Sequence, residues 1–95
     1  ELATKARAAF PDDAQVARTL GILSYKRADY SRAAQLLKES ARTLQSDPEL
    51  LYYLGMSQYQ LKSRSEAKST LEKAISLKLP ASFAEEAKRV LAELK

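Results

Sequence analysis

Cysteine and histidine are both absent from this chain of 95 residues. The absence of cysteine removes disulfides and thiolate chemistry, and the chain also lacks a glycine-rich phosphate loop and a ligand set for a transition metal. The adjacent acidic pairs Asp12-Asp13 and Glu85-Glu86 lie at expected helix starts, where carboxylates interact favourably with the helix dipole. We therefore predict that the protein is not an enzyme and holds no cofactor or metal.

Glycine, proline and long apolar runs are also scarce. The chain has two Gly and three Pro, too few for a turn-rich β fold, and its 45% of hydrophobic residues is too high for a disordered chain. No apolar run approaches the roughly 20 residues of a membrane span, so we expect one small soluble domain without membrane insertion. The chain begins with Glu1 inside a helical pattern, without Met or a signal-peptide layout. This predicts a piece of a longer protein and leaves the compartment undetermined.

Charge of both signs is spread along the whole chain. Sixteen Lys and Arg stand against twelve Asp and Glu, for a net charge of +4, and the two halves have the same balance. A nucleic-acid module usually concentrates its basic residues on one face or segment. No nucleic-acid partner is therefore expected; a binder of that kind would lose affinity steeply with salt.

The two glycines belong to a repeated pattern. "TLGILSYKRADYSRAAQLL" occupies residues 19–37, and "YLGMSQYQLKSRSEAKSTL" follows at residues 53–71. Alignment of Gly21 on Gly55, 34 residues apart, needs no gap. It pairs Leu20 with Leu54, Tyr25 with Tyr59, Ala33 with Ala67, Leu37 with Leu71 and Ser40 with Ala74. A period of this length is typical of stacked repeats, each too small to bury its own apolar face.

Apolar spacing within each repeat predicts two helices joined by very short turns, which must then pack antiparallel. Polar residues suited to capping precede several of these helices. They are Asp29, Asp47 followed by Pro48, and the capping-box pairs Ser63 with Glu66 and Ser82 with Glu85. The expected helices cover residues 2–10, 14–27, 30–44, 48–61, 64–77 and 82–94.

Each glycine falls in the middle of an expected helix, where Gly costs about 1 kcal/mol relative to Ala. That cost is offset if a neighbouring helix must approach the backbone, with the small residues Ala33 and Ala67 where it crosses. Replacing Gly55 with Leu is then expected to be severe because of overpacking. Replacement with Ala is expected to be mild.

The pattern of Leu-Gly, Tyr four residues later, Ala twelve residues after the Gly and then Leu resembles the tetratricopeptide repeat, a helix–turn–helix unit of 34 residues. The resemblance covers nearly the whole chain. It implies an all-α fold in which antiparallel helix–turn–helix repeats stack in a right-handed superhelix (an α-solenoid). The implied divisions are a partial preceding repeat (1–13), repeat one (14–47), repeat two (48–81) and a C-terminal capping helix (82–95).

The last expected helix departs from the repeat. Its apolar residues form one stripe, while Lys88 and Arg89 stand where a further repeat would need Leu-Gly. The array is therefore expected to stop at this helix. The stripe comprises Phe83, Ala87, Val90, Leu91 and Leu94.

Arrays of this kind bind peptides or protein segments in a concave groove lined by the first helix of each repeat, which implies a non-catalytic protein-interaction scaffold. The resemblance places eight residues in that groove, most of them large and apolar, whereas Tyr30 and Tyr53 are expected in the core. An apolar or amphipathic partner segment fits such a surface. The groove residues are Arg18, Ile22, Tyr25, Lys26, Tyr52, Met56, Tyr59 and Gln60.

Two further observations bear on the partner. Some relatives clamp the terminal carboxylate of a chaperone tail with Lys, Arg and Asn, but this chain has no asparagine and lacks that clamp. The alternative to a scaffold is a structural segment that self-assembles or joins a longer repeat protein. It rests on Leu2, Ala3, Ala6 and Ala9, an apolar face left uncovered on the truncated first helix.

Overall fold

The structure, a computed structural model, describes residues 13–94, and this part of the chain contains helices but no strand. The five expected helices that fall in this range are confirmed to within a few residues; the largest difference is the end of the second helix of repeat one, which stops at Ala41 and not at residue 44. The helix expected at 2–10 lies outside the described residues. The helices are α2 (Ala14–Lys26), α3 (Tyr30–Ala41), α4 (Pro48–Gln60), α5 (Arg64–Ser76) and α6 (Ala81–Leu94).

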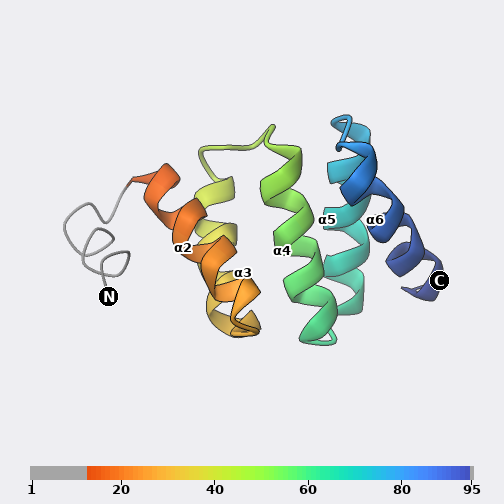
Figure 1. Ribbon diagram of the computed structural model, residues 1–95, viewed down its shortest axis with the longest axis horizontal. Helices are drawn as coiled ribbons and strands as arrows, with labels where there is room; N and C mark the ends of the chain where they lie inside the picture. Colours follow the sequence, from red (N-terminus) through yellow and green to blue (C-terminus); the bar gives the residue numbers. More distant parts are fainter. Residues whose placement is uncertain (1–12, 95) are drawn as a thin grey trace.

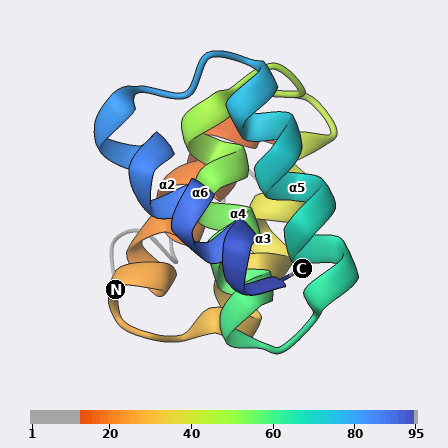
Figure 2. The same ribbon diagram turned by 90° about the vertical axis from the view of Figure 1, so that its right-hand side faces the viewer.

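The helices form two layers. Helices α2, α4 and α6 lie side by side in one layer, and α3 and α5 lie behind them in the other (Figures 1 and 2). The pairs α2–α3 and α4–α5 are antiparallel hairpins, and α4 contacts each of the other described helices. The fold is therefore the all-α helical repeat solenoid that the resemblance implied. The division into repeats at residues 14–47 and 48–81 stays a prediction.

Helix α4 is the centre of the core. Every residue from 50 to 58 is buried, so this helix has no solvent-exposed stripe along most of its length. Its sequence allows neighbours on every side because, besides the tyrosines, only Glu49 in the first turn of Pro48–Gln60 has an ionisable side chain. A helix that is apolar all round is stable only when neighbours cover it on every side.

The two glycines hold the hairpins together at equivalent points. A Cβ at Gly21 would lie 2.6 Å from Cγ of Leu37, and a Cβ at Gly55 would lie 2.6 Å from Cγ of Leu71. Both leucines are fully buried. The predicted close approach is thus present, but the atoms that press on the glycines belong to these leucines and not to Ala33 or Ala67. Because Cγ is the branch point of a side chain with no room to move, this geometry favours a larger cost for Gly55→Ala than the mild one expected from the sequence.

Aspartate caps begin three of the helices. Asp13 accepts hydrogen bonds from the backbone N of Gln15 and Val16, Asp29 accepts one from Arg32, and Asp47 accepts one from Leu50. The other two expected caps are not formed. Ser63 makes no side-chain capping bond to α5, and Ser82 lies inside α6, which begins one residue before it.

The turns after α2, α4 and α5 share a feature that the sequence analysis missed. Ala28, Lys62 and Lys78 adopt left-handed backbone conformations, with φ of 63°, 64° and 65°. This conformation is usually taken by Gly at a helix C-terminus. At the first turn it lets the backbone N of Asp29 donate to the Ser24 carbonyl at 2.8 Å, which ends α2 and reverses the chain.

Helix α6 has one buried apolar stripe and an exposed basic pair. Ala87 and Val90 are fully buried against the preceding repeat, and Phe83, Leu91 and Leu94 are half-buried, as the apolar stripe predicted. Lys88 and Arg89 are exposed. A further helix would have to pack over these two cations, and the end of the array at this helix stays a prediction.

We predict that Gly55→Ala lowers the free energy of unfolding by roughly 1–3 kcal/mol, because the added methyl overlaps Leu71. Chemical denaturation measures this change. In a Leu71→Ala background, which itself costs about 2–5 kcal/mol, the same Gly55→Ala change should cost little, because the obstructing atoms are gone. Equal costs in the two backgrounds would contradict the close contact.

We predict that Ala28→Gly raises the free energy of unfolding by about 0.5–1 kcal/mol. Glycine removes the steric cost of a left-handed residue and loses part of that gain through its freer unfolded state. Ala92→Gly is the matched control, since it makes the same change at an exposed position inside α6 and should lower stability by about 1 kcal/mol. A loss of thermal stability in both variants would argue against the left-handed turn.

Candidate functional site

A row of five aromatic rings runs across the layer of first helices. Tyr30, at the start of α3, contacts Tyr25 of α2, with 5.6 Å between ring centroids. Tyr25 contacts Tyr53 of α4 at 5.3 Å, and Tyr53 contacts Tyr52 at 5.2 Å. Phe83 of α6 completes the row, 4.9 Å from Tyr52. Most of these pairs meet edge to face, a favourable geometry for aromatic rings, so the aromatic row links α2, α4 and α6.

The middle of the aromatic row is buried and its ends are accessible. Tyr52 and Tyr53 are 8% and 9% exposed, whereas Tyr25, Tyr30 and Phe83 are each half-buried. Tyr53 is therefore a core residue as expected, while Tyr30 is only partly one. The accessible rings lie on either side of α4, which makes them the parts of the row that a partner could touch.

Two of the predicted groove residues are corrected. Tyr52 is buried against Phe83, and Met56 is only 3% exposed, so neither projects outward from α4. The cause is α6, which lies against α4 on the side that the repeat register assigned to the groove. Both side chains belong to the core cluster.

The other predicted groove residues differ in exposure. Ile22, Tyr25 and Tyr59 are half-buried against the core cluster, and Lys26 and Gln60 are exposed. No interaction of the Lys26 ammonium is recorded with any described residue. These five residues remain accessible on the layer of first helices.

Arg18, the eighth predicted residue, is engaged within the protein. Its Nε donates to Oδ2 of Asp47 at 2.8 Å, and its Nη2 lies 3.7 Å from Oε1 of Glu49. The other oxygen of Asp47 caps α4 by accepting from the backbone N of Leu50 at 3.0 Å. We call Arg18, Asp47 and Glu49 the α2–α4 triad; it ties the two helices together and leaves the guanidinium without a free charge for a ligand.

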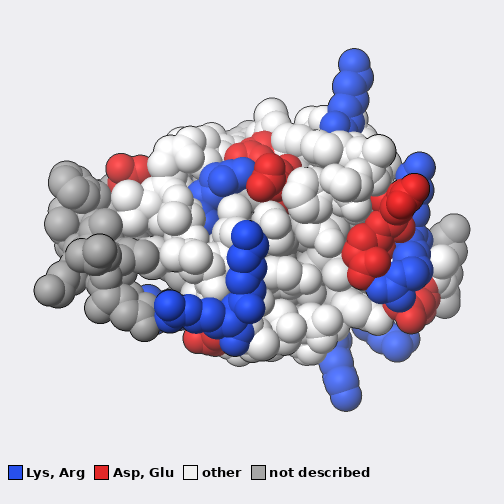
Figure 3. Space-filling model, in the orientation of Figure 1, with Lys and Arg blue, Asp and Glu red and all other residues white. Residues whose placement is uncertain are grey.

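A similar group lies on α6. The Nε of Arg89 donates to Oε2 of Glu86 at 3.1 Å, and its Nη1 lies 3.9 Å from Oε2 of Glu93. Glu93 also accepts a hydrogen bond from Oη of Tyr59 at 2.8 Å, which connects α6 to α4. We call Arg89, Glu86 and Glu93 the α6 triad. Figure 3 shows acidic and basic atoms meeting near the start of α4 and over α6, with further basic atoms on the same face.

The sequence analysis did not assign Phe83, Glu86 or Glu93 to the site, because it treated the last helix only as a cap. A signal for one of them was present. Tyr52 and Phe83 lie one period of 34 residues after Arg18 and Glu49, and the members of each pair contact each other. Continuing the repeat register into α6 would have placed Phe83 beside Tyr52.

Three tyrosines of the aromatic row, Tyr25, Tyr52 and Tyr53, have raised pKa values. Burial raises the pKa of Tyr25 to about 12, with further contributions from neighbouring tyrosines and from Glu86. Burial and then Glu86 raise the pKa of Tyr52, and burial and then Glu49 raise that of Tyr53. The hydrogen bond to Glu93 raises the pKa of Tyr59. Carboxylates of both triads therefore act on this row.

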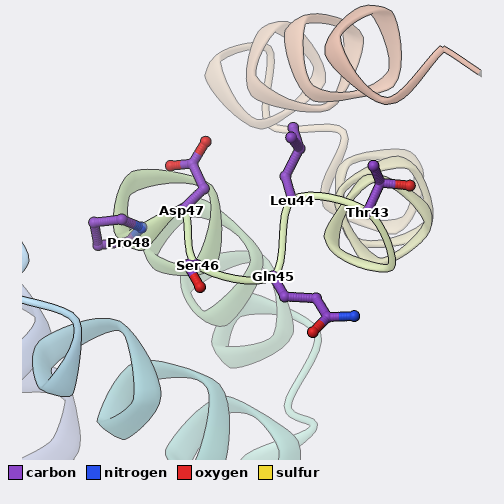
Figure 4. Close-up of a pocket in the computed structure, with 6 residues that line it drawn as sticks. All are labelled: Thr43, Leu44, Gln45, Ser46, Asp47 and Pro48. Carbon is purple, nitrogen blue, oxygen red and sulfur yellow. The ribbon is translucent and has the colours of Figure 1, made fainter.

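The remaining features offer no chemistry of their own. Within residues 13–94, no group of three or more potential metal ligands comes together, and no helix is long and apolar enough to cross a membrane. A surface hollow of about 790 Å³ lies at the α3–α4 loop, residues 43–48 (Figure 4). In it Leu44 and Asp47 project to one side of the loop and Gln45 to the other, and both Asp47 oxygens already have partners. The side chains that line this hollow do not converge on a common point.

Comparison with known proteins supports the fold. A solved structure described as "MamA MSR-1 C2" superposes with a TM-score of 0.78 and 22% sequence identity, over 98% of this chain. The chain spans 62% of the length of that chain. No family model matches the sequence, and no curated protein matches it either. The likeness shows an all-α helical repeat fold and supports the tetratricopeptide type of repeat, and any binding partner must be argued from the residues of this chain.

We predict that Tyr25 contributes to stability below about pH 10 and that this contribution disappears as the pH rises through about 12. The pKa of Tyr25 in the folded state is raised above the ordinary value of 10.0, so the folded protein holds the phenol in its neutral form. Above pH 10 the phenol ionises more readily in the unfolded chain, and this lowers the free energy of unfolding. Tyr25→Phe keeps the ring but has no phenol to ionise. Denaturant titrations across this pH range should show a smaller loss in the variant than in the wild type, and parallel losses would contradict the assignment.

Proposed function

We propose that the protein is a non-catalytic interaction module that binds a peptide or protein segment on the layer formed by α2, α4 and α6. The observation that supports this most is the aromatic row, whose accessible rings are Tyr25 of α2, Tyr30 of α3 and Phe83 of α6. Ile22 of α2 and Tyr59 of α4 are half-buried as well. Tyrosine and phenylalanine supply large contact areas at low entropic cost, which suits them to interfaces.

The binding face in this proposal differs from the one predicted from the repeat register. It comprises Ile22, Tyr25 and Lys26 of α2, Tyr59 and Gln60 of α4, and Phe83 of α6. Tyr52 and Met56 support the face from below, because their side chains are buried. Arg18 holds α2 against α4 and does not serve as a free cation.

A second candidate, self-assembly or stacking on further repeats, rests on one observation. Leu23 of α2 is 42% exposed, whereas its counterpart one period later, Ser57, is fully buried. The side of α2 that carries Leu23 is therefore open to solvent, whereas the equivalent side of α4 is covered. A second copy or another part of a longer chain would bury it.

Adjacent residues on α2 allow one experiment to separate the two functions. Ile22 packs against the core cluster on the binding face, whereas Leu23 is largely exposed and lies outside that cluster. We predict that Ile22→Glu weakens capture of a partner by at least about tenfold, on the scale of a central interface residue, while Leu23→Glu leaves it unchanged. Affinity capture with both variants and the wild type measures this.

Sedimentation across a range of concentrations reports on the alternative with the same proteins. If self-assembly is the function, Leu23→Glu dissociates an oligomer that Ile22→Glu leaves intact. Thermal denaturation of both variants checks that they are folded at the temperature of the assay. Loss of partner capture in Leu23→Glu and not in Ile22→Glu would rule out the proposed face.

A further inference from the structure

The charges around the aromatic row are balanced. Each triad contains one guanidinium and two carboxylates. Lys26 adds an exposed cation on α2, and Arg64, at the start of α5, acts on the phenol of Tyr59. Four carboxylates thus face four cations, and charge does not select a partner of either sign. Recognition on this face must depend on the aromatic rings and on their hydroxyls.

The hydroxyls in the middle of the aromatic row have no partner within the described protein. In residues 13–94, Oε1 of Gln58 is the only enclosed side-chain oxygen or nitrogen that lacks a hydrogen bond. The hydroxyls of Tyr25, Tyr52 and Tyr53 make no hydrogen bond with any described residue either, so each of them reaches the surface although its ring is largely covered. We call these three hydroxyls the phenol cluster.

The phenol cluster is a compact group of donors. The rings of Tyr25 and Tyr53 lie 5.3 Å apart, and those of Tyr53 and Tyr52 lie 5.2 Å apart. Burial is the main cause of the raised pKa of Tyr25, and the phenols of Tyr52 and Tyr53 add to it, as expected of neighbouring groups. The pKa values of all three phenols lie above 10, so each keeps its proton at physiological pH and can donate a hydrogen bond.

The backbone of the partner decides whether these donors find acceptors. An α-helix bonds its carbonyls internally, so the apolar face of an amphipathic helix would cover the phenol cluster and leave it unpartnered, which is costly. A proline-rich segment in the polyproline II conformation has no internal hydrogen bonds, and its carbonyls are free to accept. Because proline has no N–H, such a segment brings acceptors and no backbone donors of its own.

We infer that the partner segment is an uncharged, proline-rich one that lies along the aromatic row in the polyproline II conformation. Its proline rings contact Tyr25 and Phe83, and its carbonyls accept hydrogen bonds from the phenol cluster. Aromatic-lined grooves bind such segments in several unrelated domains, and the preformed conformation lowers the entropy lost on binding. This inference rests on the proposed function and names the chemistry of its partner.

Two uncharged peptides of about fifteen residues test the inference. One consists of prolines and adopts polyproline II, and the other is an amphipathic helix former built from leucine, alanine and glutamine. Each carries a fluorescent label, and the anisotropy of the label measures binding to the whole chain. We predict that the proline peptide binds at least about tenfold more tightly than the helical peptide.

Variants that remove hydroxyls and keep the rings locate the effect. Tyr25→Phe combined with Tyr52→Phe should weaken binding of the proline peptide at least about fivefold, because two donors are lost while the ring packing is retained. Ser69→Ala is the control: it removes one hydroxyl from an exposed position on α5, in the other layer, and should leave the affinity unchanged. Circular dichroism and thermal denaturation of each variant check that the fold is retained.

Equal binding of the two peptides, tighter binding of the helical peptide, or no binding of either would each overturn the inference. Undiminished binding of the proline peptide by the double phenylalanine variant would overturn it as well. The proposed function is tested separately by the Ile22→Glu and Leu23→Glu comparison. A protein that loses its partner in Ile22→Glu but does not prefer the proline peptide would keep the face and reject the proline-rich segment.

Discussion

The contact between a leucine of one helix and a glycine of its neighbour is the constraint on which the rest of this structure depends. Leu37 against Gly21 and Leu71 against Gly55 have nearly identical geometry, so each hairpin closes to the same distance. The close approach sets the spacing between α2 and α3 and between α4 and α5, and α4 also contacts α2, α3 and α6. Each glycine weakens its own helix, a cost that is offset by burial of a complete leucine side chain.

The central position of α4 determines where a partner can bind. Because α6 packs against α4, the large residues of α4 are mostly buried and support the candidate face from below. The accessible aromatic rings of that face come from α2 and α6. A hydrogen bond from Tyr59 to Glu93 and the contact of Phe83 with Tyr52 hold α6 in this place. The C-terminal helix is thus part of the candidate face and does not serve only as a cap.

The charged residues at the edge of this face lie at the start of a helix and in contacts between helices. Asp47 caps α4, and Glu49 lies in its first turn, where carboxylates are favourable. Both also pair with Arg18, so the carboxylates serve local structure and the α2–α4 contact at once. The two triads thus lie at the edges of the aromatic row and join α2 to α4 and α6 to α4.

The sequence by itself determined the helices, their hairpin pairing and the close contacts at the glycines, because a 34-residue period repeats the same local chemistry at the same positions. It also predicted the apolar stripe of the last helix, with Lys88 and Arg89 exposed beside it. Local spacing does not report how far a neighbouring helix covers a given face, so Tyr52 and Met56 were expected at the surface and are buried. The partners of Arg18 lie 29 and 31 positions away, and those of Tyr59 and Tyr52 lie on α6. Such contacts between helices exist only once the layers have packed, and the tertiary structure alone decided which side chains form the face and which charges surround it.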